Sequence, residues 1–367
     1  MPALPAPVSA AVTILLSLAA LAVVAVVVAL AISYRTTRQL LRPVRRPPRQ
    51  LPGDVGLAVE EVWIPSPRGR LAAWYLPARN GCTLICCHGI NDNRGQWLEP
   101  VARLHRARGY GALLFDFAGH GESEGSEVTY GIREQADVAA VLAYLRARGD
   151  VRLNGLGIMG YSLGAITAVL AAANEPDLQS VVIESGFADV QHDIAVLFHR
   201  FTGLPSFPFA KLVVFWGQII GHARLSDIRP AEVVGRLAPR AIFVIGDLRD
   251  GIADEPYDSD RLYARAGEPK QLWQVAGAEH VQAFSTVPDE WIERVGAFLD
   301  EHLAARVAGA GEAASEEAPL ERMGDAMQEA GQTSGGAGHL LLALDDQERA
   351  SLLKFASAVT AARNPER

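Results

Sequence analysis

Cysteine is scarce in this sequence, with three among 367 residues, and so few exclude a fold held together by several disulfide bonds. Basic residues are also in the minority, since 34 lysines and arginines stand against 42 aspartates and glutamates. The net charge of −8 gives the chain no overall attraction to nucleic acid, so we expect no nucleic-acid partner. Metal-ligand spacings, a phosphate-binding loop and the G-x-G-x-x-G dinucleotide fingerprint are missing too, so we expect no metal and no cofactor.

Charge is missing from the whole N-terminal segment, where the first charged side chain is Arg35. Residues 8–32 contain only two serines and one threonine as polar residues. A helix of about 20 apolar residues spans the hydrocarbon core of a bilayer. We therefore predict that the N-terminal segment, residues 1–34, contains one transmembrane helix over about residues 8–32.

Arginine and proline dominate the next segment, residues 35–56, which has six arginines and four prolines. Proline fixes φ and lacks a backbone donor, so residues 43–52 are expected to form a stiff, non-helical stalk.

Arginines this close to a span favour the cytoplasmic side, which predicts a single-pass membrane protein with everything after Tyr34 in the cytoplasm. The alternative is secretion after cleavage of a signal peptide near the Ala-Leu-Ala at residues 29–31; the long apolar run and the lack of an early basic residue argue against it.

Short apolar runs bounded by glycine and proline begin near residue 57 and are typical of β-strands. They alternate with helical patterns over residues 132–148, 163–174 and 291–303. This alternation predicts an α/β fold with a mostly parallel sheet, whose ligands bind beyond the carboxyl ends of the strands. The first two runs have no helix between them and are expected to form an antiparallel edge. The predicted strands are residues 59–64, 71–76, 83–87, 110–115, 156–159, 181–183, 241–245 and 271–275.

The loop after the run 156–159 has the sequence of a nucleophile elbow, G-x-S-x-G, at residues 160–164. In such an elbow the chain turns so sharply from strand to helix that the nucleophile takes strained backbone angles. Gly160 and Gly164 relieve the crowding on either side. We therefore predict Ser162 as a nucleophile that stands clear of the sheet.

A serine needs a base to become a nucleophile, and the base needs a group that orients it. Of the nine histidines, His280 is the predicted base, because it follows the last predicted strand and precedes a helix. His88 and His120 lie in turns beside glycine and are interpreted as structural.

The acid that orients the base is predicted in the loop after the strand 241–245. Asp250 lies in the middle of this loop, where its side chain can face the site, and is the favoured residue. Asp247 in the same loop and Glu184 at the end of an earlier strand are the alternatives.

An oxyanion that forms on the substrate must be met by hydrogen-bond donors that already point at it. The backbone N–H of Leu163, directly after the nucleophile, is the first predicted donor. The second is the N–H of Ile90, in the loop that begins with His88 and Gly89 after the strand 83–87. Gly89 allows the backbone to approach the site closely.

These motifs, in this order, resemble the α/β-hydrolase superfamily over residues 57–304, and most of all its serine-aminopeptidase-like and Bem46-like branch, which includes membrane-anchored serine hydrolases of acyl esters. The resemblance implies an eight-stranded sheet with helices on both faces and a catalytic triad of Ser162, Asp250 and His280. It also implies that Asp116 and His120 belong to a structural turn that lines the site. The sequence departs from the family pattern by one extra residue between Gly246 and the acid. The motif residues are His88-Gly89, residues 116–123 (DFAGHGES), residues 160–164 (GYSLG), Asp250 and residues 277–280 (GAEH).

Three further segments lie outside this motif set. Residues 187–237 separate two strands and are too long for a plain loop, so we expect an inserted helical cap. Residues 305–338 are rich in alanine, glycine and glutamate and are typical of a linker. Residues 339–367 are expected to form a short helix or a tail.

The sequence therefore predicts a membrane-anchored serine hydrolase that cleaves carboxylic esters or thioesters through an acyl-enzyme. A small-molecule or lipid-like ester with a hydrophobic acyl chain is the first expected substrate, because of the anchor and the apolar cap. A serine peptidase of aminopeptidase type is the second hypothesis. A catalytically silent, membrane-tethered binding module is the third. The sequence does not specify the oligomeric state.

Overall fold

The structure is a computed structural model that describes residues 6–222 and 224–308. All but the first four residues of the expected linker at 305–338, and the whole segment 339–367, lie outside the described residues.

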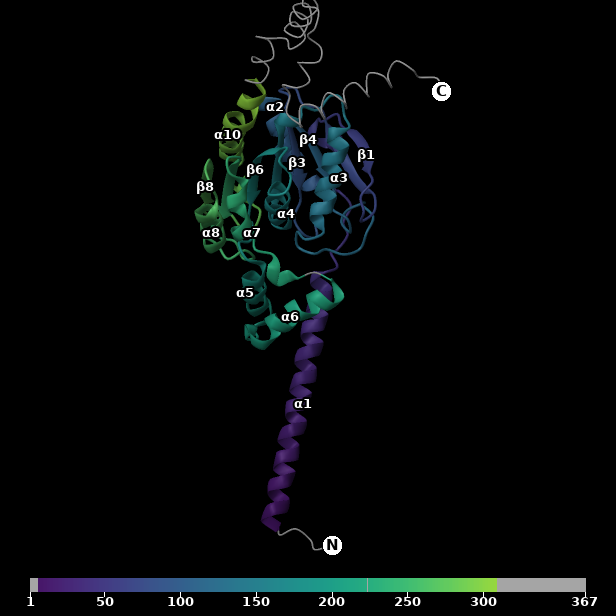
Figure 1. The fold of residues 1–367 in the computed structure, drawn as a ribbon, viewed down its shortest axis with the longest axis vertical. Coiled ribbons are helices and arrows are strands. Elements are labelled where there is room, and N and C mark those ends of the chain that lie inside the picture. The colour runs from purple at the N-terminus through teal and green to yellow at the C-terminus, as the bar shows by residue number, and fades with distance from the viewer. Residues whose placement is uncertain (1–5, 223, 309–367) are drawn as a thin grey trace, which may run out of the picture. The chain divides into compact units, whose positions relative to one another are not determined.

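An eight-stranded sheet forms the centre of the main domain (Figure 1). Its strand order is β1-β2-β4-β3-β5-β6-β7-β8. β2 pairs antiparallel with β1 and β4, and every other neighbouring pair is parallel. The predicted α/β fold, with an antiparallel edge on a mostly parallel sheet, is confirmed. The strands are β1 (Glu60–Ile64), β2 (Leu71–Leu76), β3 (Thr83–Cys87), β4 (Gly111–Phe115), β5 (Leu156–Tyr161), β6 (Leu178–Glu184), β7 (Ala241–Asp247) and β8 (Lys270–Val275).

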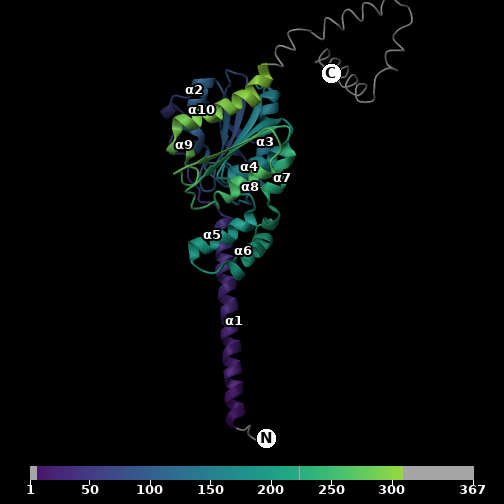
Figure 2. The ribbon, with the colours of Figure 1, turned by 90° about the vertical axis from the view of Figure 1, so that its left-hand side faces the viewer.

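Helices cover both faces of the sheet, as expected for a parallel sheet that must bury both of its apolar sides (Figure 2). One face packs on α2 and α10, and the other packs on α3, α4, α7 and α8. The carboxyl ends of the parallel strands meet at one edge, where the loops that carry the candidate site begin. These helices, with the short α9, are α2 (Leu98–Arg108), α3 (Glu134–Arg146), α4 (Leu163–Ala172), α7 (Pro230–Val233), α8 (Tyr257–Arg265), α9 (Ala283–Thr286) and α10 (Pro288–Leu299).

The N-terminal apolar segment forms one long helix, α1 (Ala6–Leu40). By length and composition it could cross a membrane, and a signal sequence near the N-terminus has the same properties. The helix continues six residues beyond Tyr34, so the first part of the expected stalk, residues 35–40, is helical. The reason is that the chain has no proline between Pro7, in the first turn of the helix, and Pro43.

The insertion between β6 and β7 forms a cap of two helices, α5 (Val190–Thr202) and α6 (Ser206–Ile220), which share a small core of their own. Residues 230–237 behave differently, because their buried side chains join the main core against the sheet. The predicted cap of 187–237 therefore extends too far, and the cap core ends near Ile228.

The core of the main domain also reaches slightly beyond the predicted limits of 57–304. It includes Val55 on one side and Val307 on the other. Both pack against the face of the sheet that α2 and α10 cover.

Candidate active site

Ser162 occupies the turn between β5 and α4 with φ 51° and ψ −111°, a strained conformation for a residue with a side chain. The two flanking glycines leave no room for a Cβ. A Cβ on Gly160 would lie 2.2 Å from the carbonyl oxygen of Gly164, and one on Gly164 would lie 2.1 Å from that of Cys87. The sequence G-x-S-x-G is therefore required by the close approach of three backbone segments.

His280 and Asp250 come from the loops after β8 and β7, and both reach Ser162. His280 Nε2 lies 2.9 Å from Ser162 Oγ, and His280 Nδ1 lies 2.6 Å from Asp250 Oδ2. The other carboxylate oxygen, Asp250 Oδ1, accepts the backbone N–H groups of Ile252 and Ala253 at 2.6 and 2.9 Å. The side chain of Asp250 is fully buried and that of His280 is 17% exposed. The three residues that the sequence favoured thus form one continuous chain of polar contacts.

The alternative acids, Asp247 and Glu184, make contacts around this chain and have no hydrogen bond to His280 within the described part of the protein. Asp247 Oδ2 accepts the Ser185 hydroxyl at 2.6 Å, and Ser185 Oγ accepts the N–H of Val281 at 3.0 Å. Burial raises the pKa of Asp247 to about 6.

Glu184 serves the same loop from a different strand. Its Oε1 accepts the N–H of Ala283 at 3.0 Å, and its Oε2 accepts the indole N–H of Trp291 at 3.1 Å. Burial, and then the neighbouring Asp247, raise the pKa of this carboxyl well above its usual range. Both carboxylates therefore hold the segment that follows His280.

The two predicted oxyanion donors lie at the site. Leu163 is the first residue of α4, so its N–H has no intrahelical partner. Ile90 and Gly89 line the same pocket as Ser162, and a Cβ built on Gly89 would lie 3.7 Å from the Cβ of Ser162.

The loop that contains Ile90 is held by a residue that sequence reasoning missed. Gln96 Oε1 accepts the N–H of Gly89 at 2.8 Å. Gln96 itself follows a loop and carries no motif, so only the folded chain identifies it.

His88 supports this loop as the sequence predicted, although it does not line the pocket. Its Nε2 accepts the N–H of Phe117 at 3.0 Å, and its Nδ1 donates to the carbonyl of Gly89 at 2.7 Å. Burial lowers the pKa of this imidazole, in keeping with a neutral ring that donates once and accepts once. Asp116 and His120, expected to line the site, are fully buried and absent from the pocket wall. Asp116 instead accepts the N–H of Arg94 and that of Glu122.

The pocket above Ser162 has a volume of about 430 Å³. Part of its wall comes from Gln39 and Leu40, at the end of the N-terminal helix α1, which the sequence did not predict. The remaining lining residues come from the oxyanion loops, the cap and the histidine loop: Gly89, Ile90, Asn91, Asp92, Gln96, Tyr130, Ser162, Leu163, Phe187, Leu197, Ile252, His280 and Val281.

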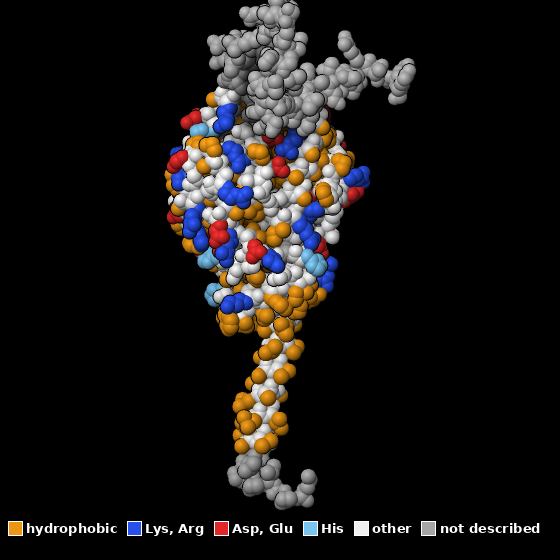
Figure 3. Space-filling view, in the orientation of Figure 1, with side chains coloured by type: hydrophobic (Ala, Val, Ile, Leu, Met, Phe, Trp, Pro, Cys, Tyr) orange, Lys and Arg blue, Asp and Glu red, His pale blue; other side chains and the backbone are white. Residues whose placement is uncertain are grey.

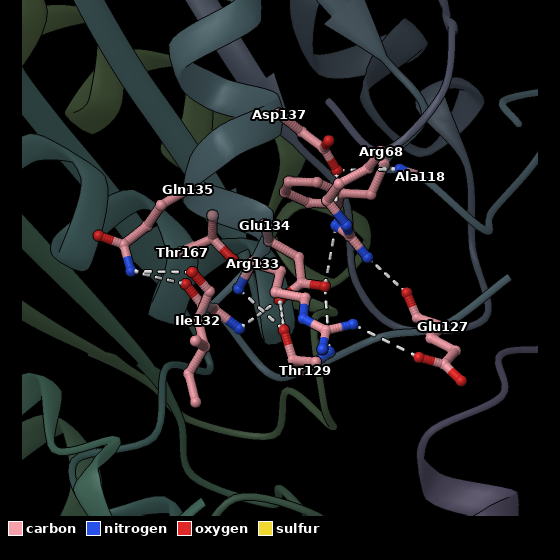
Figure 4. Close-up of polar contacts among 12 residues, drawn as sticks. Arg68, Ala118, Glu127, Thr129, Ile132, Arg133, Glu134, Gln135, Asp137 and Thr167 are labelled. Carbon is pink, nitrogen blue, oxygen red and sulfur yellow. Dashed lines mark hydrogen bonds and ion pairs between the residues drawn. The ribbon is translucent and has the colours of Figure 1, made fainter. Parts of the chain in front are cut away.

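Tyr130 stands in this wall on a turn with φ 52°. The buried side chain of Glu134, labelled in Figure 4, fixes that turn. Glu134 accepts the backbone N–H groups of Thr129 and Gly131 at 3.0 and 2.8 Å. Arg68 contacts Glu134 at 3.1 Å and Asp137 at 2.7 Å, so one guanidinium ties both buried carboxylates together. The wall around Tyr130 is thus rigidly supported from the main domain.

Within residues 6–222 and 224–308, no group of three or more histidine, cysteine, aspartate or glutamate side chains is arranged to hold a metal ion. The expectation that the protein uses no metal or cofactor stays a prediction.

Comparison with known proteins places this geometry in a family. A model of the alpha/beta hydrolase family matches residues 84–351. The Bacillus subtilis protein YqkD is 28% identical over 221 residues, which cover 59% of this chain and 71% of YqkD. The Arabidopsis thaliana alpha/beta hydrolase domain-containing protein WAV2 is 26% identical over 229 residues, which cover 59% of this chain and 69% of WAV2.

A solved structure shares the fold. The Pyrococcus furiosus esterase Pf2001 superposes with a TM-score of 0.60 at 23% identity, covering 72% of this chain and 99% of its own. Because the family model spans well over half of the sequence, the chain belongs to the alpha/beta hydrolase family.

Proposed function

We propose that the protein is a serine hydrolase that cleaves carboxylic esters or thioesters through Ser162, His280 and Asp250. The observation that carries the proposal is the unbroken chain of contacts from Asp250 through His280 to Ser162, at 2.6 and 2.9 Å. Nucleophile, base and orienting acid at these separations match the geometry by which catalytic triads are recognised.

The reaction follows from the positions of these groups. With Nδ1–H donated to Asp250, His280 Nε2 accepts the proton of Ser162 Oγ while Oγ attacks the carbonyl carbon. The N–H groups of Leu163 and Ile90 stabilise the oxyanion. The tetrahedral intermediate expels the alcohol or thiol, which takes the proton from His280, and an acyl-enzyme remains. Water then repeats the sequence and releases the acid.

An ester is the favoured substrate because the pocket is mostly apolar, and because Pf2001, whose fold is similar, is named an esterase.

One observation favours a peptidase as the second candidate. Asp92 lines the pocket, where a carboxylate could hold the ammonium group of a peptide N-terminus. The resemblance to the serine-aminopeptidase-like and Bem46-like branch is compatible with both and stays a prediction. A silent binding module has no need of the intact polar chain.

The full-length protein in detergent tests these alternatives directly. We expect it to react with a fluorophosphonate probe and to hydrolyse p-nitrophenyl esters faster than aminoacyl p-nitroanilides. The reverse preference would favour the peptidase, and a folded protein that does neither would support the binding module.

We further propose that α1 anchors the protein in a membrane with the catalytic domain in the cytoplasm. All six arginines of residues 35–49 are exposed, as topology signals at a membrane surface would be. Secretion after cleavage near residue 31 is the alternative.

This topology predicts the labelling of Ser126→Cys, a change at an exposed position. The three native cysteines are buried and free, so they give little background. In intact cells an impermeant maleimide should leave the new cysteine unmodified, and it should react after lysis. Labelling in intact cells, or an intact mass that starts after residue 31, would contradict the cytoplasmic placement.

A second prediction concerns the support of the oxyanion loop. Gln96→Leu removes the acceptor for the Gly89 N–H and should lower kcat by about 10- to 100-fold, with KM little changed, because the Ile90 donor loses its alignment. Steady-state ester hydrolysis measures both constants. Gln179→Leu is the matched control, because the side chain of this glutamine on β6 hydrogen-bonds only the carbonyl of Pro176 among the described residues, and the variant should behave as the unaltered protein. A selective rise in KM for Gln96→Leu would instead assign Gln96 to substrate binding.

A further inference from the structure

A second cavity, with a volume of about 110 Å³, adjoins the pocket above Ser162. Four residues line both spaces: Leu40, Tyr130, Phe187 and Leu197. The other residues of this second cavity come from α1, α5 and α6: Thr36, Val190, Asp193, Ile194, Phe198, Thr202 and Val213.

The cavity suits a hydrocarbon chain. Most of its wall consists of valine, leucine, isoleucine and phenylalanine side chains; Thr36, Thr202 and Tyr130 also line it, and Asp193 is its single acidic residue. Asp193 is buried, and burial followed by the neighbouring Asp258 raises its pKa to about 9. The carboxyl is therefore neutral at pH 7, and a charged ligand group finds no partner in this cavity.

The end of α1 is a fixed part of this wall. Thr37 Oγ1 donates to the carbonyl of Val213 on α6 at 3.2 Å, and Tyr34 meets Trp216 edge to face at 5.3 Å. The Tyr130 hydroxyl donates to the carbonyl of Leu40 at 3.2 Å. The helix thus contacts both the cap and the main domain where it lines the cavity.

The same helix relates the cavity to a membrane. Its large apolar side chains are exposed up to Val28, and the first fully buried side chain is Ser33. Leu40 lies eight residues beyond Ile32, about 12 Å along the helix at 1.5 Å per residue. The polar layer on one side of a bilayer is about 5–8 Å thick, so a hydrocarbon core that ends at Ile32 would place Thr36 of the cavity wall inside this layer and Leu40 just beyond it.

The cap presents apolar side chains beside α1. Phe207, Phe215 and Ile219 of α6 are 70%, 50% and 47% exposed. Figure 3 shows hydrophobic side chains gathered where α1 meets this part of the molecule. An exposed apolar patch next to a candidate membrane helix fits contact with lipid.

A polar cavity adjoins the pocket at other residues. It shares Asn91, Asp92 and Gln96 with the pocket above Ser162 and is also lined by Arg46 and Arg49. The site therefore has an apolar and a polar extension, which matches a molecule that has an acyl chain and a polar headgroup.

We propose that the last turns of α1 form one wall of an acyl-chain site, and that this site takes the chain of a lipid ester from the bilayer in which α1 lies. The proposal rests on the proposed hydrolase function and deepens it by naming the substrate class. It also gives α1 a role in substrate selection beyond anchoring.

The test fills the cavity from two elements. Thr36 on α1 and Ile194 on α5 line the apolar cavity and do not line the pocket above Ser162. Thr36→Trp and Ile194→Trp therefore each place an indole in the apolar cavity alone. The full-length protein is assayed with p-nitrophenyl palmitate carried in phosphatidylcholine vesicles and with p-nitrophenyl acetate in solution. Both variants should lower the ratio of kcat/KM for palmitate over acetate by at least about 10-fold, because displaced methylenes lose their apolar contacts.

Val196→Trp is the matched control, since residue 196 is on α5 but lines neither space, and it should leave the ratio unchanged. Phe198→Leu enlarges the cavity and should shift the preferred acyl chain to greater length. This variant tests the site even where a tryptophan variant does not fold. If only Ile194→Trp lost the palmitate preference, α1 would not be part of the acyl-chain site. An unchanged ratio in all variants, with Ser162-dependent hydrolysis intact, would overturn the acyl site, whereas absence of hydrolysis with either ester would overturn the hydrolase function itself.

Discussion

Ser162→Ala is expected to abolish fluorophosphonate labelling and to lower kcat for ester hydrolysis by at least about 10⁴-fold. Among the described residues, the Ser162 hydroxyl is the only group that forms a hydrogen bond with His280 Nε2. Without it, no acyl-enzyme can form, and only stabilisation of the attacking water by the oxyanion donors remains. Alanine fits the site, because it removes one oxygen and leaves the turn between Gly160 and Gly164 unchanged.

Two further variants make this result specific. Ser180→Ala removes a buried serine on β6 whose hydroxyl has no hydrogen-bond partner in the described structure, and it should keep full labelling. His280→Ala should lose labelling as Ser162→Ala does, because Oγ then has no base. Circular dichroism and the melting temperature confirm that each variant is folded. A folded Ser162→Ala protein that still reacts with the probe would place the nucleophile elsewhere.

The sheet could be predicted because its inner strands, β2 to β7, are short apolar runs that are buried on both faces. Their ends could not, because hydrogen-bond pairing continues past the apolar residues. β5 extends to Tyr161 because Gly160 and Tyr161 still pair with Ile183 and Glu184. Such pairing depends on the neighbouring strand and leaves no mark in the local sequence.

The nucleophile and base of the site could be proposed from sequence because each lies at a fixed place after a strand. The choice of acid needed the structure, because Asp247 and Asp250 lie three residues apart and only side-chain direction separates them. The contribution of Leu40 could not be foreseen. It lines the same cavities as Leu197 only because the cap folds back onto the end of α1, some 157 positions earlier in the chain.

Asp250→Asn should lower kcat by about 10³- to 10⁴-fold, because a neutral amide no longer stabilises the protonated His280 or holds its tautomer. The loop should stay folded, since the remaining amide oxygen can still accept the N–H groups of Ile252 and Ala253. Hydrolysis of p-nitrophenyl butyrate at pH 8 measures the loss, and the melting temperature checks the fold.

Asp247→Asn is the matched comparison, and kcat should change less than about 10-fold, because Asp247 reaches the loop of His280 only through Ser185.

The main effect of Asp247→Asn should be on the stability of the fold. The folded pKa of Asp247, about 6, is above the ordinary value of 3.8, so the folded protein holds this proton more tightly than the unfolded chain does. That contribution is fully present below pH 4 and is lost as the pH rises through 6. The melting temperature of Asp247→Asn should therefore fall less steeply between pH 4 and 7 than that of the unaltered protein. A 10³-fold loss of kcat in Asp247→Asn, with Asp250→Asn still active, would exchange the roles of the two carboxylates.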